Sequence, residues 1–232
     1  RCLQSTTKIS ENSQCAVGLY GEILLTSDNG NNWINKISNT TNHLYGISAF
    51  NSTIISVGAN GTILKSTDSG NSWLIKSSPS NYDLMSVKVV NENIAFACGF
   101  NGLVLKSTDG GETWLTKNTF SYEHLRGIDF VDESNGFAVG GSVGEITTSI
   151  ILKTTNGGDT WSNLYSPSLN TLNAVDFFDE QFGIAVGIRG NILKTTNGGS
   201  SWTSAYTDIP HWLYSVYVIS KTHIFICGGN VN

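Results

Sequence analysis

Short apolar stretches separated by turn residues recur along the whole chain. In residues 43–77 they read "HLYGISAF", "IISVG", "TILKST" and "SWLIKS". Their lengths and their Val, Ile, Leu and Phe content predict β-strands, and the brief turns between them predict antiparallel pairing. The same segments return in residues 172–206 as "LNAVDFF", "GIAVG", "NILKTT" and "SWTSAY". The pattern therefore predicts four short strands per repeat and no helix.

One turn motif, S/T-x-D/N-x-G-x-x-W, marks each repeat. It occurs five times, ending at Trp33, Trp73, Trp114, Trp161 and Trp202. The successive spacings are 40, 41, 47 and 41 residues (73−33, 114−73, 161−114, 202−161), a period typical of a repeated supersecondary unit. Four antiparallel strands in such a period predict an all-β fold, a β-propeller. The shorter coils of a parallel β-helix fit this period less well.

The repeats predict one propeller domain over residues 1–232, with five full blades and a partial sixth. The expected blade boundaries are 1–37, 38–77, 78–118, 119–165, 166–206 and 207–232. The last repeat offers only two strand-like segments, "WLYSVYV" and "IFICGG". Because proteins usually cover unpaired strand edges, we expect a ring of six or seven blades, completed by further chain or by a partner.

The motif "STDGGETW" predicts a structural corner. The Asp109 carboxylate can accept backbone N–H groups of its own turn, Gly110 and Gly111 tolerate positive φ, and Trp114 can bury its ring beside the corner. We expect the same structural role from all five copies: Asp28 with Trp33, Asp68 with Trp73, Asp109 with Trp114, Asn156 with Trp161, and Asn197 with Trp202.

A calcium loop is the alternative interpretation of this motif. Such a loop needs several carboxylates close in sequence, whereas the last two copies carry neutral Asn156 and Asn197. We therefore expect no metal and no cofactor.

Composition narrows the class of partner. Only 13% of the 232 residues are charged, the net charge is −5, and three arginines (Arg1, Arg126 and Arg189) form no basic stripe. Nucleic-acid partners are therefore not expected. The Ser-, Thr-, Asn- and Gly-rich polarity suggests a secreted, periplasmic or cell-surface protein. No apolar run is long enough for a membrane span.

The five motifs, preceded by G-x-I-L-K-S/T-T, resemble the Asp-box (BNR) repeat of β-propellers, and the nearest group is the Ycf48-like photosystem II stability factors. The resemblance covers nearly the whole chain and implies the fold more strongly than the function. Sialidases, sortilin-type receptors, xyloglucanases and non-enzymatic scaffolds share the box. The photosystem role implies an arginine-rich patch, which Arg126 and Arg189 do not make.

No catalytic constellation emerges from the sequence. The sialidases that the repeat resembles need an arginine triad, which Arg1, Arg126 and Arg189 do not plausibly form. A two-carboxylate glycosidase would have to draw on Asp83, Glu145, Asp176 and Glu180, which belong to different blades or opposite strand ends. The histidines His43, His124, His211 and His223 lack a nucleophile motif. We favour a non-enzymatic scaffold that binds a protein or glycan, with a carbohydrate-active propeller, catalytic or lectin-like, as the alternative.

Strand directions locate the expected binding surface. The corner between strands three and four shares an end with the turn between strands one and two, so the opposite end collects the entries to strand one and the turns between strands two and three. Aromatic, His and Arg residues gather there, a composition typical of binding hot spots. The expected binding residues are His43, Tyr45, Asp83, Phe100, His124, Arg126, Arg189, Trp212 and Tyr214.

Tyr20, Asn60, Met85, Asn101, Thr171 and Asn173 fall on the same end, together with the fourth repeat's insertion, residues 141–150. Loops of this kind carry function while a scaffold repeats. The alternative is that all of these are ordinary solvated loop residues.

The cysteines are expected to be unpaired. Cys98 and Cys227 share one strand register in different repeats, too far apart for a disulfide, and should be buried thiols. Cys15 should lie opposite Ile9 and not opposite Cys2, which disfavours a bridge between Cys2 and Cys15 but leaves it open.

Overall fold

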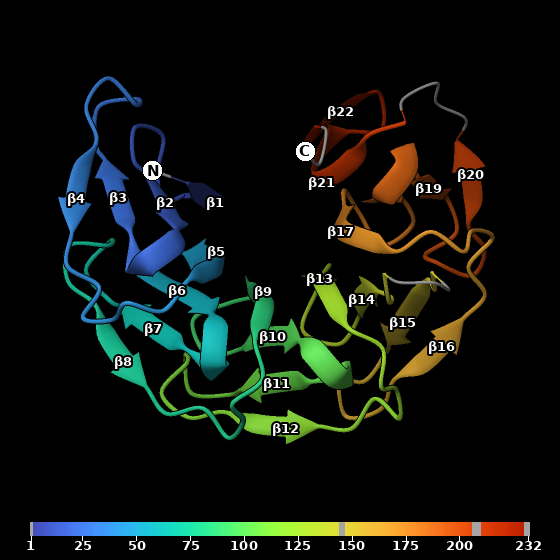
Figure 1. The fold of residues 1–232 in the computed structure, drawn as a ribbon, viewed down its shortest axis with the longest axis horizontal. Coiled ribbons are helices and arrows are strands. Elements are labelled where there is room, and N and C mark those ends of the chain that lie inside the picture. Colours follow the sequence, from blue (N-terminus) through green and yellow to red (C-terminus); the bar gives the residue numbers. More distant parts are fainter. Residues whose placement is uncertain (1, 144–146, 206–209, 230–232) are drawn as a thin grey trace. The chain divides into compact units, whose positions relative to one another are not determined.

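The computed structural model describes residues 2–143, 147–205 and 210–229, and it is built almost entirely of antiparallel sheet (Figure 1). Five sheets have four strands in chain order and the last has two. Helical structure in the described residues is limited to the 3-10 turns η1 (Leu19–Gly21), η2 (Ala59–Gly61), η3 (Phe100–Gly102) and η4 (Ile188–Gly190). The predicted all-β architecture, with five complete blades and a partial sixth, is confirmed.

The first three blades share one strand arrangement. The first contains β1 (Leu3–Lys8), β2 (Gln14–Gly18), β3 (Ile23–Thr26) and β4 (Ile34–Lys36); the second contains β5 (Leu44–Phe50), β6 (Thr53–Gly58), β7 (Ile63–Ser66) and β8 (Leu74–Lys76). The third contains β9 (Leu84–Val89), β10 (Ala95–Gly99), β11 (Val104–Ser107) and β12 (Leu115–Lys117).

These blades, without η3, form one compact unit, Arg1–Gly99 with Leu103–Lys117. Strand β5 contacts both β1 and β9, so the second blade is packed on two sides. Its adjacent residues Ile54 and Ile55 are both fully buried, Ile54 in a cluster shared with the first blade and Ile55 in a cluster shared with the third. Burial of both sheet faces explains why the strands read as apolar runs and not as strict alternation.

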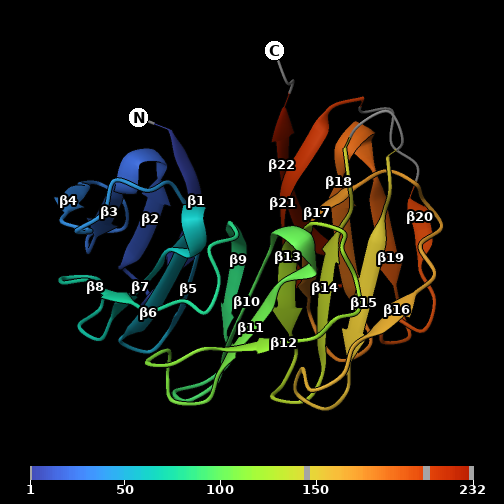
Figure 2. The same cartoon turned by 60° about the horizontal axis from the view of Figure 1, so that its bottom comes forward.

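The remaining blades belong to a second unit, Phe100–Gly102 with Asn118–Asn232. They contain β13 (Leu125–Phe130), β14 (Gly136–Gly140), β15 (Ile150–Thr154) and β16 (Ser162–Leu164); β17 (Leu172–Phe177), β18 (Gly183–Gly187), β19 (Ile192–Thr195) and β20 (Thr203–Ala205); and β21 (Trp212–Ser220) with β22 (His223–Gly229). Strand β17 contacts β13 and β21, and Figure 2 shows these strands side by side. The single-domain organisation stays a prediction.

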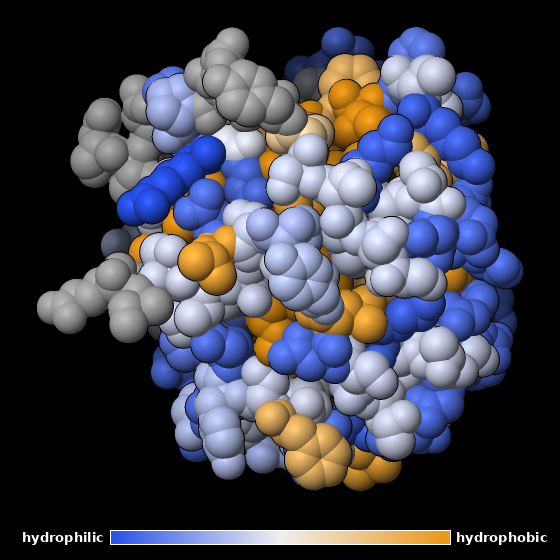
Figure 3. Space-filling view, turned by 90° about the vertical axis from the view of Figure 1, so that its right-hand side faces the viewer, coloured by the Kyte–Doolittle hydropathy of each residue, from blue (hydrophilic) through white to orange (hydrophobic). Residues whose placement is uncertain are grey.

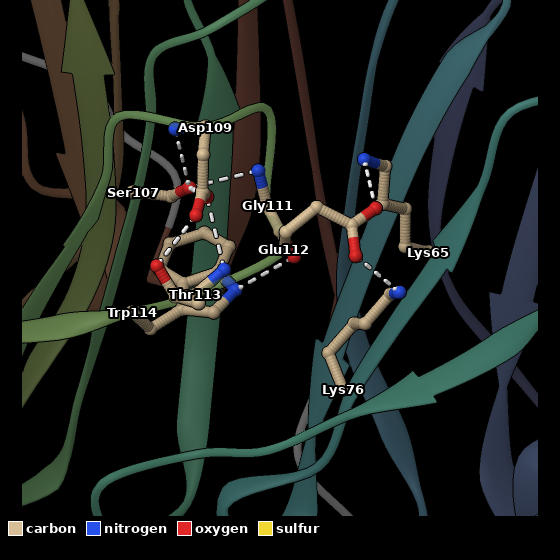
Figure 4. Close-up of polar contacts among 8 residues, drawn as sticks. All are labelled: Lys65, Lys76, Ser107, Asp109, Gly111, Glu112, Thr113 and Trp114. Atoms are coloured by element: carbon tan, nitrogen blue, oxygen red, sulfur yellow. Dashed lines mark hydrogen bonds and ion pairs between the residues drawn. The ribbon is translucent and has the colours of Figure 1, made fainter.

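The corner turn at residues 107–114 has the expected geometry (Figure 4). Thr113 donates its backbone N–H and its hydroxyl to the Asp109 carboxylate, at 2.9 and 2.6 Å. Gly110 and Gly111 have φ of 69° and 88°, and the Trp114 indole donates to the Gly111 carbonyl at 3.2 Å. Glu112 points out of the turn towards the second blade, where Lys65 and Lys76 donate to it at 2.7 and 2.6 Å.

Burial of the corner tryptophans is confirmed for four of the five, and the expectation was wrong for the first. Trp114 is 5% exposed and packs against the second blade, whereas Trp33 is 39% exposed. Trp73, Trp114 and Trp202 each belong to an apolar cluster shared with the preceding blade of the same unit, whereas Trp33 has no preceding blade among the described residues of its unit. Trp161, also in the first blade of its unit, lies edge on to Phe130 of its own blade.

The corner carboxylates make stability sensitive to acid. Hydrogen bonds from Ser72 and Thr113 lower the pKa of Asp68 and Asp109 to about 2 from 3.8. A depressed folded-state pKa contributes stability above about pH 4 that is lost as the pH falls towards 2. Between pH 5 and pH 2 the free energy of unfolding of wild type should fall by roughly 1 to 2 kcal/mol more than that of the double variant Asp68→Asn, Asp109→Asn. This figure allows for solvent screening of these exposed turns.

Urea denaturation at each pH measures this effect. The fourth blade supplies the precedent for the substitution, because Asn156 accepts the Thr160 backbone N–H at 3.0 Å and donates to its hydroxyl at 2.9 Å. Near-equal stability at neutral pH is therefore expected, and an unchanged acid slope would contradict the assignment.

All four cysteines are free thiols. Cys98 is buried, as predicted, and burial raises its pKa. The prediction for Cys227 was wrong, since this thiol is exposed. Its strand β22 pairs only with β21 among the described strands, whereas β10, which carries Cys98, is flanked by β9 and β11 on its two edges. Cys15 lies opposite Thr7 and not opposite Ile9, so the expected register was also wrong. Burial raises the Cys15 pKa to about 12.

Candidate partner-binding site

Recurrent hydrogen bonds fix which turns share an end of a blade. The Gly110 N–H, in the corner turn, donates to the carbonyl of Asn93, in the turn between the first and second strands, at 2.7 Å. The equivalent bond exists in each complete blade, from Asn29 to Asn12, Ser69 to Ser52, Gly157 to Ser134, and Gly198 to Gln181. We call this the corner end. The opposite, entry end comprises the residues leading into each first strand and the turns between the second and third strands.

Each first strand carries a bulge at the entry end. Leu44 pairs with Gly58 and Gly46 with Val57, so Tyr45 is skipped in the register. The same shift skips Met85, Arg126, Asn173 and Tyr214. Because a bulge redirects a side chain out of the regular pleat, the bulge explains why these positions vary among Tyr, Met, Arg and Asn.

The turns between the second and third strands hold residues in the left-handed region. Tyr20, Asn60, Asn101 and Arg189 have φ between 55° and 60°. Asn tolerates this conformation, but Tyr and Arg pay a strain cost to adopt it. Tyr20 and Arg189 nevertheless expose their side chains to solvent, so the backbone presents them outward.

Three of the expected binding residues also join neighbouring blades. The Tyr20 N–H donates to Nδ1 of His43 at 3.0 Å, the Asn60 N–H to Oδ1 of Asp83 at 2.9 Å, and the Asn101 N–H to Nδ1 of His124 at 3.1 Å. An accepting Nδ1 requires a neutral imidazole with its proton on Nε2. His and Asp interchange here because both supply an acceptor.

In the first unit, aromatic side chains cluster around His43. Its ring lies 4.8 Å from that of Tyr20, edge on, and 6.3 Å from that of Tyr45. Partial burial, and then the charge of Asp83, raise the pKa of Tyr45. An open pocket of about 1100 Å³ adjoins this cluster and is lined by Tyr20, Lys36 and Ile37 among others.

In the second unit, Phe100 stacks on His124 with their ring centroids 4.3 Å apart. The Arg126 Nε is buried and has no hydrogen-bond partner among the described residues, and desolvation lowers the pKa of this guanidinium. Trp212 and Tyr214 lie 6.4 Å apart between ring centroids. The structure therefore gathers the expected residues into local groups at the entry ends of the blades.

The carboxylates considered for glycoside hydrolysis have structural partners or lie elsewhere. Asp83 accepts the Asn60 N–H, as above, and Asp176 accepts the Val218 N–H at 2.6 Å. Glu180 lies at the corner end, and Glu145 lies outside the described residues. Within the described ranges, no group of three or more His, Cys, Asp or Glu side chains could hold a metal ion, and no helix has the length and hydropathy to cross a bilayer.

Sequence reasoning missed a set of side chains that bind one first strand to the next. Buried Asp129 accepts the Phe177 N–H at 2.8 Å, and Ser48 accepts the Val89 N–H at 3.0 Å. With Asp176, these residues stand four positions after the entry leucines Leu44, Leu125 and Leu172. A polar residue recurring inside an apolar strand was the available signal.

The side of the second unit that carries β16 and β20 shows no large apolar surface. In Figure 3, hydrophilic and intermediate side chains cover most of this face, and hydrophobic ones are scattered among them. An extended hydrophobic docking face is therefore not visible there.

No protein-family model and no curated protein matches the chain. Among solved structures, YCF48 bound to a D1 peptide is 14% identical with a TM-score of 0.65, covering 98% of this chain and 88% of that one. The WD40 propeller domain of Doa1 is 10% identical with a TM-score of 0.77, covering 98% and 76%. A GH74 xyloglucanase from Xanthomonas campestris is 12% identical with a TM-score of 0.78. The match covers 98% of this chain but only 44% of that enzyme. At these identities the likeness shows the fold, a β-propeller.

Proposed function

We propose that this protein is a non-enzymatic binding scaffold, each of whose two units binds polypeptide at the entry ends of its own blades. The observation that carries the proposal is the presentation of Tyr20, Tyr45, Arg126 and Tyr214 on bulges and strained turns at these ends. Bulges and strained turns cluster at functional positions. The corner turns, in contrast, are occupied by their own hydrogen bonds. The structurally similar YCF48 bound to a D1 peptide supports a peptide ligand.

We also propose that the scaffold works outside the cytoplasm, in a secreted, periplasmic or cell-surface setting. The low charge content and the Ser-, Thr- and Asn-rich polarity support this setting. Fractionation of the native organism with an antibody against the chain tests it, and recovery in the cytoplasmic fraction would contradict it.

A carbohydrate-active propeller is the second candidate, because a GH74 xyloglucanase shares the fold. The engagement of Asp83 and Asp176 with backbone N–H groups weighs against a hydrolytic pair. A glycan array combined with a reducing-sugar release assay separates the two functions. Reproducible glycan ligands or sugar release would favour this second candidate.

Binding of peptides selected on the wild-type protein from a phage-displayed random library tests the proposal. We expect Tyr45→Ala to weaken binding of the peptides that bind the first unit, and Arg126→Ala and Trp212→Ala binding of those that bind the second, by about tenfold or more while the variants stay folded, since aromatic and Arg anchors dominate binding energy. Charge reversals of two exposed carboxylates at the corner end, Glu92→Lys and Glu180→Lys, serve as controls. Binding that survives the first set but is lost in the second would reverse the assignment of ends.

A further inference from the structure

A second pocket lies beside the segment that leads into the first strand of the fourth blade, next to the expected residue His124, and extends along the third and fourth strands to Trp161. It has a volume of about 480 Å³ and is lined by residues 119–123, Ser142, Ile150, Leu152, Trp161 and Asn163. Two of its aromatic side chains point into solvent, because Phe120 is 83% and Tyr122 is 86% exposed. Rings this exposed gain little from packing on their own protein, so their faces are free to contact a ligand bound in the pocket.

The carboxylate of Glu123 is oriented within this pocket. Ser142 donates its hydroxyl to Oε2 at 2.6 Å, and Thr148 donates to the same oxygen at 2.8 Å. Both donors belong to the described residues that follow β14, so Ser142 and Thr148 help to build the site. Among the described residues, no Lys or Arg forms an ion pair with Glu123, and no group donates to its Oε1. A carboxylate that two hydroxyls hold in place, and whose second oxygen has no donor, can accept a hydrogen bond from a cationic group.

Phe120 adds a strained residue to the pocket. Its φ is +54°, close to the +61° of Asn39 at the equivalent position after the first blade. Asn39 uses its amide to donate to the Trp73 carbonyl at 3.2 Å. The phenyl group of Phe120 cannot make that bond and lies mostly in solvent. A bulky side chain held at positive φ without a packing gain points to a role outside the fold.

We propose that this pocket binds a basic side chain, Lys or Arg, of the partner polypeptide. Its cationic group meets the open oxygen of Glu123 and lies against the rings of Tyr122 and Phe120, where ring faces attract cations. The net charge of −5 favours a basic partner. This inference rests on the proposed peptide-binding function and specifies the chemistry of its partner. A sugar is the competing ligand for exposed rings, and the experiment distinguishes the two.

Peptides selected from the random library on the full chain provide the probes. We expect one position of the selected sequences to be enriched in Lys or Arg, and Glu123→Gln to weaken their binding about tenfold. Gln retains an oxygen that accepts from Ser142 and Thr148, so the substitution removes the charge and keeps the local bonds. Replacing the basic peptide residue by norleucine should weaken binding to wild type by the same factor of about ten, and should not weaken binding to Glu123→Gln any further.

Glu180→Gln is the matched control, because it makes the same charge change on an exposed residue at the corner end of the same unit; its peptide binding should equal that of wild type. Peptides that bind without a common basic position, or equally to wild type and Glu123→Gln, overturn this inference and leave the proposed function standing. Failure to select any peptide counts against both. If the protein binds glycans, and that binding is lost in Tyr122→Ala but kept in Glu123→Gln, the ligand of this pocket is a sugar and not a basic side chain.

Discussion

Replacing Trp114 with Ala is expected to lower the free energy of unfolding by about 3 to 5 kcal/mol. The indole is 5% exposed, packs among Ile55, Val57 and Ile63 of the preceding blade, and donates to the Gly111 carbonyl. The substitution therefore leaves a cavity between two blades and loses a corner hydrogen bond. Urea denaturation followed by tryptophan fluorescence and circular dichroism measures the loss.

Trp33→Ala is the matched control, because it changes the same residue type in the same motif. Trp33 is 39% exposed, so its removal should cost less, about 1 to 2 kcal/mol. Equal losses from the two substitutions would show that the corner turn itself, and not packing against the preceding blade, supplies the stability.

Gly58→Ala should be the second most damaging change, at about 3 kcal/mol. A Cβ on Gly58 would lie 1.9 Å from the carbonyl oxygen of His43, which the bulge brings onto the second strand. The φ of Gly58 is −170°, an extended conformation open to any residue, so the cost comes from the contact alone. Gly99, Gly140 and Gly187 approach the carbonyls of Asp83, His124 and Thr171 in the same way.

Gly229→Ala provides the comparison, since a Cβ there would meet no atom of the described residues beyond its chain neighbours within 4 Å. We expect it to change stability by no more than about 0.5 kcal/mol, with any gain coming from the restricted unfolded chain. Thermal unfolding of both variants measures the difference. A neutral Gly58→Ala would mean that the bulge relaxes freely and does not hold the entry residues in place.

The fold was predictable because its determinants are local and repeated. Turn residues at fixed offsets and strand-length apolar runs identify the blade, and Gly110, Gly111 and Trp114 take the geometry that their chemistry predicts. The errors arose where a residue depends on its neighbours in space. Trp33 and Cys227 carry the same local sequence signals as Trp114 and Cys98, but among the described residues of its own unit Trp33 has no preceding blade, and the strand of Cys227 pairs on one side only.

The candidate site was predictable in position but not in mechanism. Strand direction alone placed His43, Asp83 and His124 at one end, yet only coordinates reveal that each accepts an N–H from the adjacent blade. The bulges could not be predicted from the sequence either, because a one-residue shift of register requires no particular residue types. Glu123 escaped attention because its partners Ser142 and Thr148 lie 19 and 25 residues further along the chain and become its neighbours only in the folded structure.

The division of Ile54 and Ile55 between two apolar clusters has a thermodynamic consequence. A blade with one face in each of two interfaces has little stability of its own, and within a unit the free energy resides in couplings between nearest neighbours. Such a system opens from its ends, so amide hydrogens of the outermost sheets exchange first and those of β6 exchange last. Each unit is thus held by coupling between blades, and a ligand bound at the bulges, as we propose, would tighten the unit without moving it.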